Sequence, residues 1–595
     1  MKAVLISDKK LPDDSVEYTY PHSNLTHFQD NIVNKTLSAL LKTPIIGKKL
    51  NRTITTGAAS SGTNRPYELS CKADYTSYDS LTDYTYYGRH LKPASKEWLD
   101  SLPPIQDVVK MFERRSNGSK DVQVICPKST MLFPTFAQHL IDSFIVTAIK
   151  ENSSEGVVFN WRKTGSPHDI GLLPLYGKTI EQTTQLRLKS EVKGSKGRMK
   201  TQIIKGGEWS PYLFDSKGNK KAEFSSLPDP EGLEFALMEA KKFGVDAEKN
   251  KASVFALGGS RANLTPNIVA WNTLLLREHN SIAAKIEAEN PEWDDERVFQ
   301  TARNVNLAVY LRLVIEEYIN HITAFGVDFT VEPGKWMWDA PWYKRNWISA
   351  EFAVLYRWHA VIPNCMKWGE KTLPTAAYLY SNHLLLDDTG LKGDLREAFI
   401  NISNHRATSM EIHNSEKWMT GRDSRALQMS RECELRSFTE YCAYLGKPVP
   451  KTFADITSDV EVQNELKALY GKVENVEFWV GLIAKDHPTE AIMSAELTTF
   501  VANDAFNQAL THPLLSEHVW AAGPETFSKV GWEMVTKVPS IKDMLQRNTG
   551  GAPIDGFVGM TNPHYRIPLS EITTKILFAL FVVLAAVAYK AYTEM

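Results

Sequence analysis

The chain has 595 residues, of which 43% are hydrophobic and 23% charged, as in an ordinary globular protein. Its net charge of -2 gives no bulk attraction for a polyanion, so no nucleic-acid partner is expected. The length predicts either several domains or one large domain built around a cofactor. The five cysteines are scattered and never form a Cys-x-x-Cys pair, which excludes a zinc site and a disulfide framework and favours a reducing compartment.

Residues 1–75 are polar and rich in turn formers, and we expect them to form an N-terminal extension. The apolar start is too short for a signal peptide. Within the extension, the leucines of segment 32–42 share one helical face, which suits a membrane-surface helix or an ordinary packing helix. The small residues of 57–62 predict a flexible link.

Helical patterns dominate residues 76–565, the expected catalytic domain. Thr265 as N-cap and Pro266 at the first helical position predict a helix over 265–285. An acidic first turn at 294–296 begins a second helix that runs toward Tyr318. Strand patterns are few, and the best are 157–159 and 200–204. The predicted fold class is therefore mainly α.

The last segment, 570–595, is a hydrophobic tail. Its uninterrupted apolar run, Ile576–Tyr589, is flanked by Lys575 and Lys590. A full membrane span needs about 20 residues, but flanking lysines can extend a shorter run. We therefore expect a membrane-associated, tail-anchored protein, at the endoplasmic reticulum or a similar membrane, and the alternative is a buried terminal helix.

The segment 351–359 carries a candidate pair of reactive side chains. On a continuous helix, Tyr356 and His359 are three residues apart and share a face. A neutral imidazole is a common ligand of haem iron, and a phenol one turn away could be oxidised through the haem and then abstract hydrogen. The alternative is that both residues belong to the core.

Two further clusters have polar residues at helical spacing. Gln138 and Asp142 lie four apart in 136–142 and either line a cofactor pocket or form a polar stripe on the surface. Arg277, Glu278 and His279 form a cluster that is costly to bury unless its members pair with one another, so a structural role is expected.

Several motifs together, in this order, resemble the cyclooxygenases (prostaglandin-endoperoxide synthases) within the animal-type haem peroxidase superfamily. The resemblance spans about residues 76 to 545, most of the chain. The segments that carry it are Thr85–Arg89, Phe136–His139, Leu175–Gly177, Leu276–Asn280, Trp293–Glu296, Ile315–Tyr318, the Tyr-x-Trp-His motif of 356–359, and Leu469–Gly471.

The resemblance implies a haem cofactor, haem b (iron protoporphyrin IX), with His359 as proximal iron ligand and Trp358 beside it. It implies that Tyr356 forms the catalytic radical, with Phe352 and Leu355 in contact with substrate. A polyunsaturated fatty acid and O2 would be the substrates. Because the animal relatives are homodimers, a homodimer is the expected assembly.

The chain departs from the family on the distal side of the haem. The position of the family's distal histidine is Asp142, and the only nearby imidazole is His139. A carboxylate can still move a proton on peroxide, with a different pKa. Arg261 resembles the distal arginine of the myeloperoxidase branch and could stabilise a leaving hydroxide. The alternative for Arg261 is a surface arginine at a helix start.

Three further departures concern the substrate channel. The serine that aspirin acetylates in animal cyclooxygenases falls on Ala505. The arginine that binds the substrate carboxylate falls on Asn34, which leaves Lys35 as the candidate cation. The tyrosine that supports the catalytic tyrosine falls on Phe325. The cysteine-rich module of the animal enzymes is absent.

The sequence thus leaves three hypotheses of function. The first is a cyclooxygenase-type dioxygenase that makes prostaglandin endoperoxides from arachidonate-like acids. The second is a related fatty-acid dioxygenase that makes hydroperoxides. The third is a haem-binding relative without oxygenase activity, against which the retained Tyr356 argues, because haem binding alone needs only His359.

Overall fold

The computed structural model describes residues 16–19, 46–60, 70–72, 75, 77–117, 120–153, 156–322, 329–344, 346–487, 491–537 and 539–565. Helices dominate these residues and strands are few and short, so the predicted mainly α class is confirmed. The strand candidate 157–159 lies within β5, and residues 202–204 of the candidate 200–204 form β6. The division into an extension, a catalytic domain and a tail stays a prediction.

The α-helices are α2 (Ile46–Ser60), α3 (Tyr78–Thr82), α4 (Lys96–Asp100), α5 (Ile105–Val108), α6 (Leu132–Asp142), α7 (Leu173–Tyr176), α8 (Ile180–Leu186), α9 (Leu233–Lys242), α10 (Ala247–Ala252), α11 (Pro266–Glu289), α12 (Asp295–Leu313), α13 (Asn320–Ile322), α14 (Lys335–Trp338), α15 (Ala350–Leu355), α16 (Leu395–Asn404), α17 (Thr420–Glu432), α18 (Phe438–Tyr444), α19 (Val460–Tyr470), α20 (Phe478–Ala484), α21 (Ala495–Leu510), α22 (Glu517–Trp520), α23 (Pro524–Phe527), α24 (Lys529–Thr536) and α25 (Ile541–Arg547).

The strands are β1 (Val16–Thr19), β2 (Ser116–Asn117), β3 (Lys120–Thr130), β4 (Thr147–Ser153), β5 (Gly156–Thr164), β6 (Gln202–Ile204), β7 (Gly207–Trp209), β8 (Cys365–Trp368), β9 (Lys371–Pro374) and β10 (Arg406–Thr408). The largest sheet has β3 between parallel β1 and antiparallel β10, with β2 also paired to β3. The other strands form the hairpins β4–β5, β6–β7 and β8–β9.

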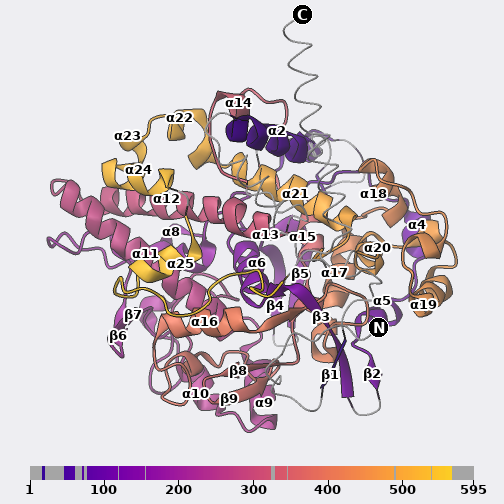
Figure 1. The fold of residues 1–595 in the computed structure, drawn as a ribbon, viewed down its shortest axis with the longest axis horizontal. Coiled ribbons are helices and arrows are strands. Elements are labelled where there is room, and N and C mark those ends of the chain that lie inside the picture. Colours follow the sequence, from indigo (N-terminus) through magenta and orange to yellow (C-terminus); the bar gives the residue numbers. More distant parts are fainter. Residues whose placement is uncertain are drawn as a thin grey trace, which may run out of the picture.

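Two long helices, α11 and α12, lie side by side through the core and pack on α6 and its neighbours (Figure 1). The Thr265 hydroxyl accepts the Ile268 N–H and Pro266 opens α11, as predicted. The Asp294 carboxylate caps α12, which continues as a π-helix, η3 (Val314–Ile319). Such a π-helix shifts the register of one turn and is frequent at functional sites; here it carries Tyr318.

The helix α2 packs along α21 at the top of the view in Figure 1. Residues 57–60 belong to α2, so the prediction of a flexible link over 57–62 is wrong for them. Packing overrides the local pattern, because Ala59 is fully buried and Asn51 bonds to the backbone of Thr330. The segment 32–42 lies outside the described residues.

The cluster 277–279 is buried on α11, but its members do not pair with one another as expected. Glu278 accepts hydrogen bonds from Arg547 and Asn548 near the end of α25. His279 bonds to the Tyr176 hydroxyl and to the Gly197 carbonyl. Arg277 donates from Nε to the Glu208 carbonyl, so each side chain ties α11 to a different segment.

We expect the Arg547→Leu substitution to destabilise the fold by about 3 kcal/mol, because it leaves the carboxylate of the fully buried Glu278 without its cation. Denaturant unfolding of the purified protein measures this. The control is Lys335→Leu, which breaks an exposed i, i+4 pair with Asp339 and should cost under about 1 kcal/mol. Equal costs for the two variants would contradict the assignment.

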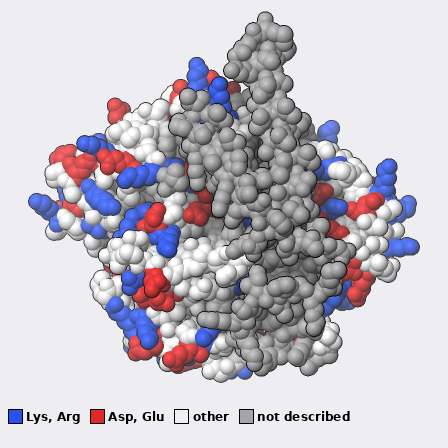
Figure 2. Space-filling model, viewed as in Figure 1, with Lys and Arg blue, Asp and Glu red and all other residues white. Residues whose placement is uncertain are grey.

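The predicted membrane-associated location is corrected. Among the residues that the structure describes, none of the helices has the length and apolar character needed to cross a bilayer. The run 576–589, on which the tail anchor rested, lies outside those residues. On the face seen in Figure 2, acidic and basic side chains are interspersed.

Candidate active site

Tyr356 lies where α15 ends. The Ser349 hydroxyl caps the start of this helix, and Tyr356 leaves it with ψ 44°. The prediction of a continuous helix from 351 to 359 is therefore wrong. The physical reason is that the rings of Tyr356 and Trp358 stack with their centroids 4.5 Å apart, a contact that residues two apart cannot make on an α-helix.

The phenol of Tyr356 is buried among aromatic rings. Phe352 meets it edge-on at 4.9 Å between centroids, and its hydroxyl makes no hydrogen bond in the structure. Burial raises the pKa of Tyr356 far above its ordinary value, and the interaction with the nearby Tyr318 hydroxyl opposes that rise. The phenol next to Tyr356 is therefore that of Tyr318, which lies in η3. Phe325, the position predicted for a supporting side chain, lies outside the described residues.

The helix α21 passes close to Tyr356. The negative charge of Asp504 also raises the pKa of Tyr356, which places this carboxylate in its electrostatic neighbourhood. Asp504 accepts hydrogen bonds from Ser349 and pairs with His90 at 3.2 Å. Ala505, the position predicted for the acetylated serine, is buried on the same helix. Leu355 is fully buried at the end of α15.

His359 opens a short 3-10 helix, η4 (His359–Val361), and its ring is held by a residue 64 positions later in the chain. Its Nδ1 lies 2.6 Å from the carboxylate of Asp423 on α17. A hydrogen bond from Nδ1–H to a carboxylate fixes the ring and leaves the Nε2 lone pair available to bind a metal. This arrangement is the usual one for a ligating histidine.

The helix α6 carries three predicted site residues, Gln138, His139 and Asp142. Only Gln138 and Asp142 interact with each other. Asp142 is buried, and its Oδ1 accepts a hydrogen bond of 2.7 Å from Arg261 Nε. Burial raises the pKa of this carboxyl group, and Arg261 opposes the rise. Gln138 interacts with Asp142 and lines a cleft. Arg261 is therefore no isolated surface arginine.

His139 points to another side of α6 than Gln138, about 100° around the helix. Its ring is fully buried between α11 and α12, with Nδ1 2.8 Å from the Tyr310 hydroxyl and Nε2 3.1 Å from Asn272 Oδ1. Burial lowers its pKa to about 4. Both ring nitrogens are engaged and the imidazole is neutral near pH 7, so His139 holds the helices together and does not line the cleft.

Arginines gather around these groups. Arg357, next to Tyr356, has its pKa lowered to about 10 by burial and by the nearby Arg261. Burial and the nearby charge of Arg425, which is also on α17, lower the pKa of Arg422. Glu231 is a second carboxylate near these arginines, in addition to Asp142. It forms an ion pair with Arg425. Within the described residues, the cluster therefore holds more cations than anions.

A narrow cleft of about 60 Å³ lies beside this cluster, well below the range of about 300–1,000 Å³ common for ligand and cofactor pockets. Gln138 bounds it on the α6 side. Ile362, three residues after His359, and Arg422, adjacent to Asp423, bound it on the other. Most of the remaining lining is apolar or aromatic, including Tyr378, Trp418 and Met419.

The fold and this site define a family. The model of the animal haem peroxidases matches residues 170–555, and the chain belongs to this family. Membership makes the protein an oxidoreductase of the peroxidase and cyclooxygenase superfamily and implies a haem cofactor.

Among curated proteins, the chain is 26% identical to prostaglandin G/H synthase 2 of Equus caballus over 551 residues, which are 90% of this chain and 82% of that protein. It is 27% identical to prostaglandin G/H synthase 1 of Mus musculus over 81% of this chain and 74% of that protein.

Among solved structures, the fold is similar to fatty acid alpha-dioxygenase of Arabidopsis thaliana, with a TM-score of 0.61, 13% identity and coverage of 90% of this chain and 92% of that one. Peroxidase A of Dictyostelium discoideum gives a TM-score of 0.57 at 19% identity, over 80% and 94% of the two chains. These likenesses concern the fold.

The residues present fit a haem group. His359 keeps one ring nitrogen for iron, and the surplus of arginine charge beside it suits a cofactor that carries two carboxylates. Sequence reasoning missed Asp423, Tyr318 and Arg422. No local spacing links them to His359 or Tyr356, because the tertiary fold alone brings them together.

Proposed function

We propose that this protein is a haem b-dependent fatty-acid dioxygenase of the cyclooxygenase type, which converts an arachidonate-like acid and O2 into a prostaglandin endoperoxide. The observation that carries the proposal is the pair formed by Tyr356 and His359. The phenol is buried and makes no hydrogen bond, and the imidazole close by in the chain is fixed through Nδ1 by Asp423.

Each of these residues has a separate role in the proposed reaction. Haem, when bound, supplies oxidising power from peroxide. His359 holds the iron, and Arg357 and Arg422 bind the cofactor's carboxylates. Tyr356, as a phenoxyl radical, takes a hydrogen atom from the carbon between two double bonds and regains its O–H. The carbon radical that remains adds O2, and the peroxyl radical closes the endoperoxide ring. The new carbon radical adds a second O2, and the last peroxyl radical takes the hydrogen atom back from Tyr356, which restores the phenoxyl radical. Phe352 and Leu355 position the chain of the substrate, and Trp358 supports the phenol by stacking.

The charge near Tyr356 bears on where oxygen is added. A fatty-acid carboxylate placed next to the phenol would meet the negative charge of Asp504, which already raises the pKa of Tyr356. Like charges at short range in a buried site repel strongly. This supports abstraction far from the carboxylate and disfavours oxidation at the carbon beside it. The predicted carboxylate partner, Lys35, lies outside the described residues.

Product analysis tests the proposal. The haem-loaded protein is incubated with arachidonate while oxygen uptake is followed, and the products are identified by mass spectrometry. Endoperoxides require two molecules of O2 per fatty acid, whereas hydroperoxides require one. Prostaglandin-type products support the proposal. Hydroperoxides alone would support the related dioxygenase, and 2-hydroperoxy acids or no oxygen uptake would overturn the proposal.

We further propose that Asp142 and Arg261 handle the proton and the charge when peroxide is cleaved, with Gln138 orienting the peroxide. The raised pKa of Asp142 suits a group that gives and takes a proton. We expect Asp142→Asn to lower peroxidase turnover about a hundredfold, the lower limit of typical acid–base contributions, and to lengthen the lag before oxygen uptake. Stopped-flow measurement of a reducing co-substrate gives the rate.

The control for this prediction is Glu231→Gln, which removes the other carboxylate near Arg261 and leaves the Arg261–Asp142 hydrogen bond in place. Its turnover should fall less than about tenfold, the effect of one hydrogen bond or charge contact. If Asp142→Asn keeps wild-type peroxidase turnover, the distal role of Asp142 is wrong.

A further inference from the structure

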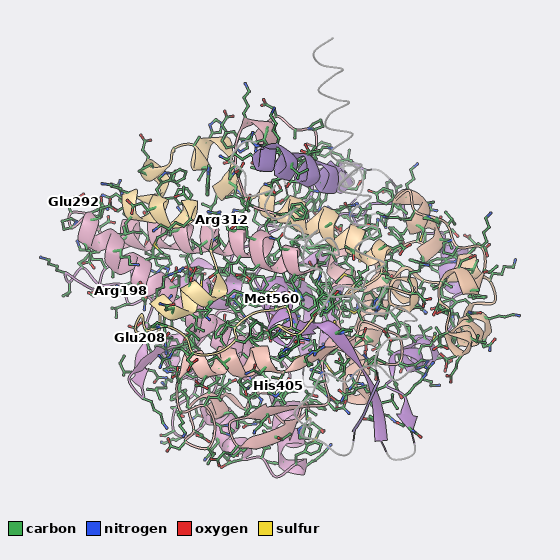
Figure 3. The ribbon with its side chains drawn as sticks, in the orientation of Figure 1. Arg198, Glu208, Glu292, Arg312, His405 and Met560 are labelled. Carbon is green, nitrogen blue, oxygen red and sulfur yellow. The ribbon has the colours of Figure 1, made fainter. Side chains whose placement is uncertain are left out.

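A hydrogen-bonded pair of a phenol and an imidazole joins α12 to α6. Tyr310, on α12, and His139, on α6, are both fully buried, and the Tyr310 hydroxyl lies 2.8 Å from His139 Nδ1. Arg312, labelled in Figure 3, lies two residues further along α12 and marks this part of the helix. The proposed function uses neither side chain of the pair.

The neighbours of His139 determine which of its ring nitrogens carries the proton. Asn272 donates from Nδ2 to the Ala262 carbonyl at 3.0 Å, which turns its Oδ1 toward His139 Nε2 at 3.1 Å. An amide oxygen only accepts, so Nε2 carries the hydrogen and Nδ1 keeps a lone pair. Burial lowers the pKa of His139 to about 4, so the ring holds no second proton near pH 7. The Tyr310 O–H therefore donates to Nδ1.

This arrangement allows Tyr310 to lose an electron without leaving a positive charge on its ring. A phenol that loses an electron becomes a strong acid, and a buried charge without a partner is costly. Here the proton can move along the existing hydrogen bond to His139 Nδ1, while Asn272 Oδ1 continues to accept the other N–H. Burial raises the pKa of Tyr310 far above its ordinary value, so the phenol keeps its proton until it is oxidised.

Aromatic rings connect Tyr310 with the proposed radical residue, Tyr356. The Tyr310 ring stacks on Phe136 with 5.4 Å between centroids, and Phe136 lies 5.2 Å from the ring of Tyr318. The hydroxyl of Tyr318 interacts with that of Tyr356. On the other side, the charge of Asp142 acts on the pKa of Tyr310. The pair therefore lies close to both reactive parts of the proposed site.

We propose that Tyr310 is a second redox-active tyrosine, with His139 as its proton acceptor. The inference rests on the proposed function, which supplies a peroxide as the oxidant. Reduction of a peroxide to an alcohol and water takes up two electrons and two protons, and oxidation of Tyr356 gives one of each. Tyr310 gives the second electron and passes its own proton to His139 Nδ1, and the solvent supplies the second proton of the water.

The products of this step are an alcohol, water, two phenoxyl radicals and one imidazolium. Only the Tyr356 radical has a role in the oxidation of the fatty acid. Tyr310 is fully buried on α12, so its radical stores the second oxidising equivalent and does not meet the fatty acid. Return of an electron to Tyr310, with the proton from His139, restores the original pair.

Electron paramagnetic resonance on the full-length, haem-loaded Tyr356→Phe protein, frozen after mixing with peroxide in the absence of fatty acid, tests the proposal. A tyrosyl radical is expected. In protein made with isotope-labelled histidine, pulsed measurements should detect coupling of that radical to an imidazole nitrogen. If the wild type forms a tyrosyl radical and Tyr356→Phe forms none, or one without this coupling, the inference is overturned and the proposed function stands.

The single variant Tyr310→Phe separates the two claims. It should keep the radical of Tyr356, because the two phenols are oxidised independently. Loss of every tyrosyl radical in a haem-loaded Tyr310→Phe protein, while Tyr356→Phe keeps a radical coupled to imidazole, would support Tyr310 and count against the proposed role of Tyr356.

Two more variants, made in the Tyr356→Phe protein, locate the proton acceptor. His139→Gln keeps a hydrogen bond to the phenol but cannot hold its proton, so the yield of the radical should fall at least about tenfold. Tyr176→Phe is the matched control, because Tyr176 is a buried phenol 2.8 Å from Nδ1 of His279 whose ring contacts Phe299 and not the rings near Tyr310. It should leave the yield unchanged. Full yield in a folded His139→Gln protein, or an equal loss in Tyr176→Phe, contradicts the assignment.

Discussion

Tyr356→Phe is expected to abolish oxygen uptake with arachidonate while the protein keeps its haem. The hydroxyl is the group that would form the radical and abstract hydrogen, and phenylalanine offers no such O–H. The hydroxyl makes no hydrogen bond, so its removal leaves no partner unsatisfied. The ring contacts with Phe352 and Trp358 persist, and stability should change by less than about 1 kcal/mol. An oxygen electrode and the haem absorption spectrum measure the two effects.

Tyr318→Phe is the matched control, because it removes the neighbouring buried hydroxyl that interacts with Tyr356. We expect oxygen uptake to fall less than about tenfold, the effect of one polar contact on the position of Tyr356. A Tyr356→Phe protein that oxygenates at the wild-type rate would refute the radical assignment, and complete loss in Tyr318→Phe would move it to Tyr318.

His359→Ala should yield a protein that purifies with little or no haem. The substitution removes the proposed iron ligand and leaves the carboxylate of Asp423 without its imidazole partner. Added imidazole should restore part of the haem binding, because it can fill the space of the lost ring and donate its N–H to the Asp423 carboxylate. The ratio of Soret to protein absorbance, with and without imidazole, reports the result.

The control is His139→Gln, which changes the other candidate imidazole of the sequence. Glutamine can still bond to Tyr310 and Asn272, the partners of both His139 ring nitrogens. We expect this variant to keep its haem. Loss of haem from a folded His139→Gln protein, with retention in His359→Ala, would reverse the roles given to the two histidines.

A third variant, Asp423→Asn, separates positioning from ligation. Asparagine can still accept a hydrogen bond from His359 Nδ1 but carries no charge, so haem should bind while the iron–histidine bond weakens. The iron–histidine stretching frequency in the resonance Raman spectrum should fall relative to wild type. An unchanged frequency would show that Asp423 does not act through His359.

Local sequence patterns were sufficient for the helices that carry the site. Thr265 and Pro266 begin α11 as predicted, and Asp142 with Arg261 forms the pair that their proposed roles require. The pattern could not show where α15 ends, because the stacking of Tyr356 on Trp358 competes with continued helix. The sequence pattern also placed His139 at the reactive site, because residue spacing along α6 does not reveal which side of that helix faces α11.

Contacts across the sequence could not be predicted at all. Asp423 lies 64 residues after His359, and Tyr318 precedes Tyr356 by 38 positions, so no periodicity joins these pairs. The arginine cluster combines Arg261, Arg357 and Arg422 from three separate segments. Likewise, the sequence places Arg277 in a polar cluster with Glu278 and His279. In the fold, Glu278 instead pairs with Arg547, and Arg277 lines a pocket.

Freeze-quench electron paramagnetic resonance on the haem-loaded protein mixed with peroxide is the most direct test of the central claim. We predict a tyrosyl radical in the wild type that disappears when arachidonate is added without oxygen, as a carbon-centred radical takes its place. Tyr356→Phe should form no radical that reacts with the fatty acid. A radical that oxidises arachidonate equally well in both proteins would contradict the account.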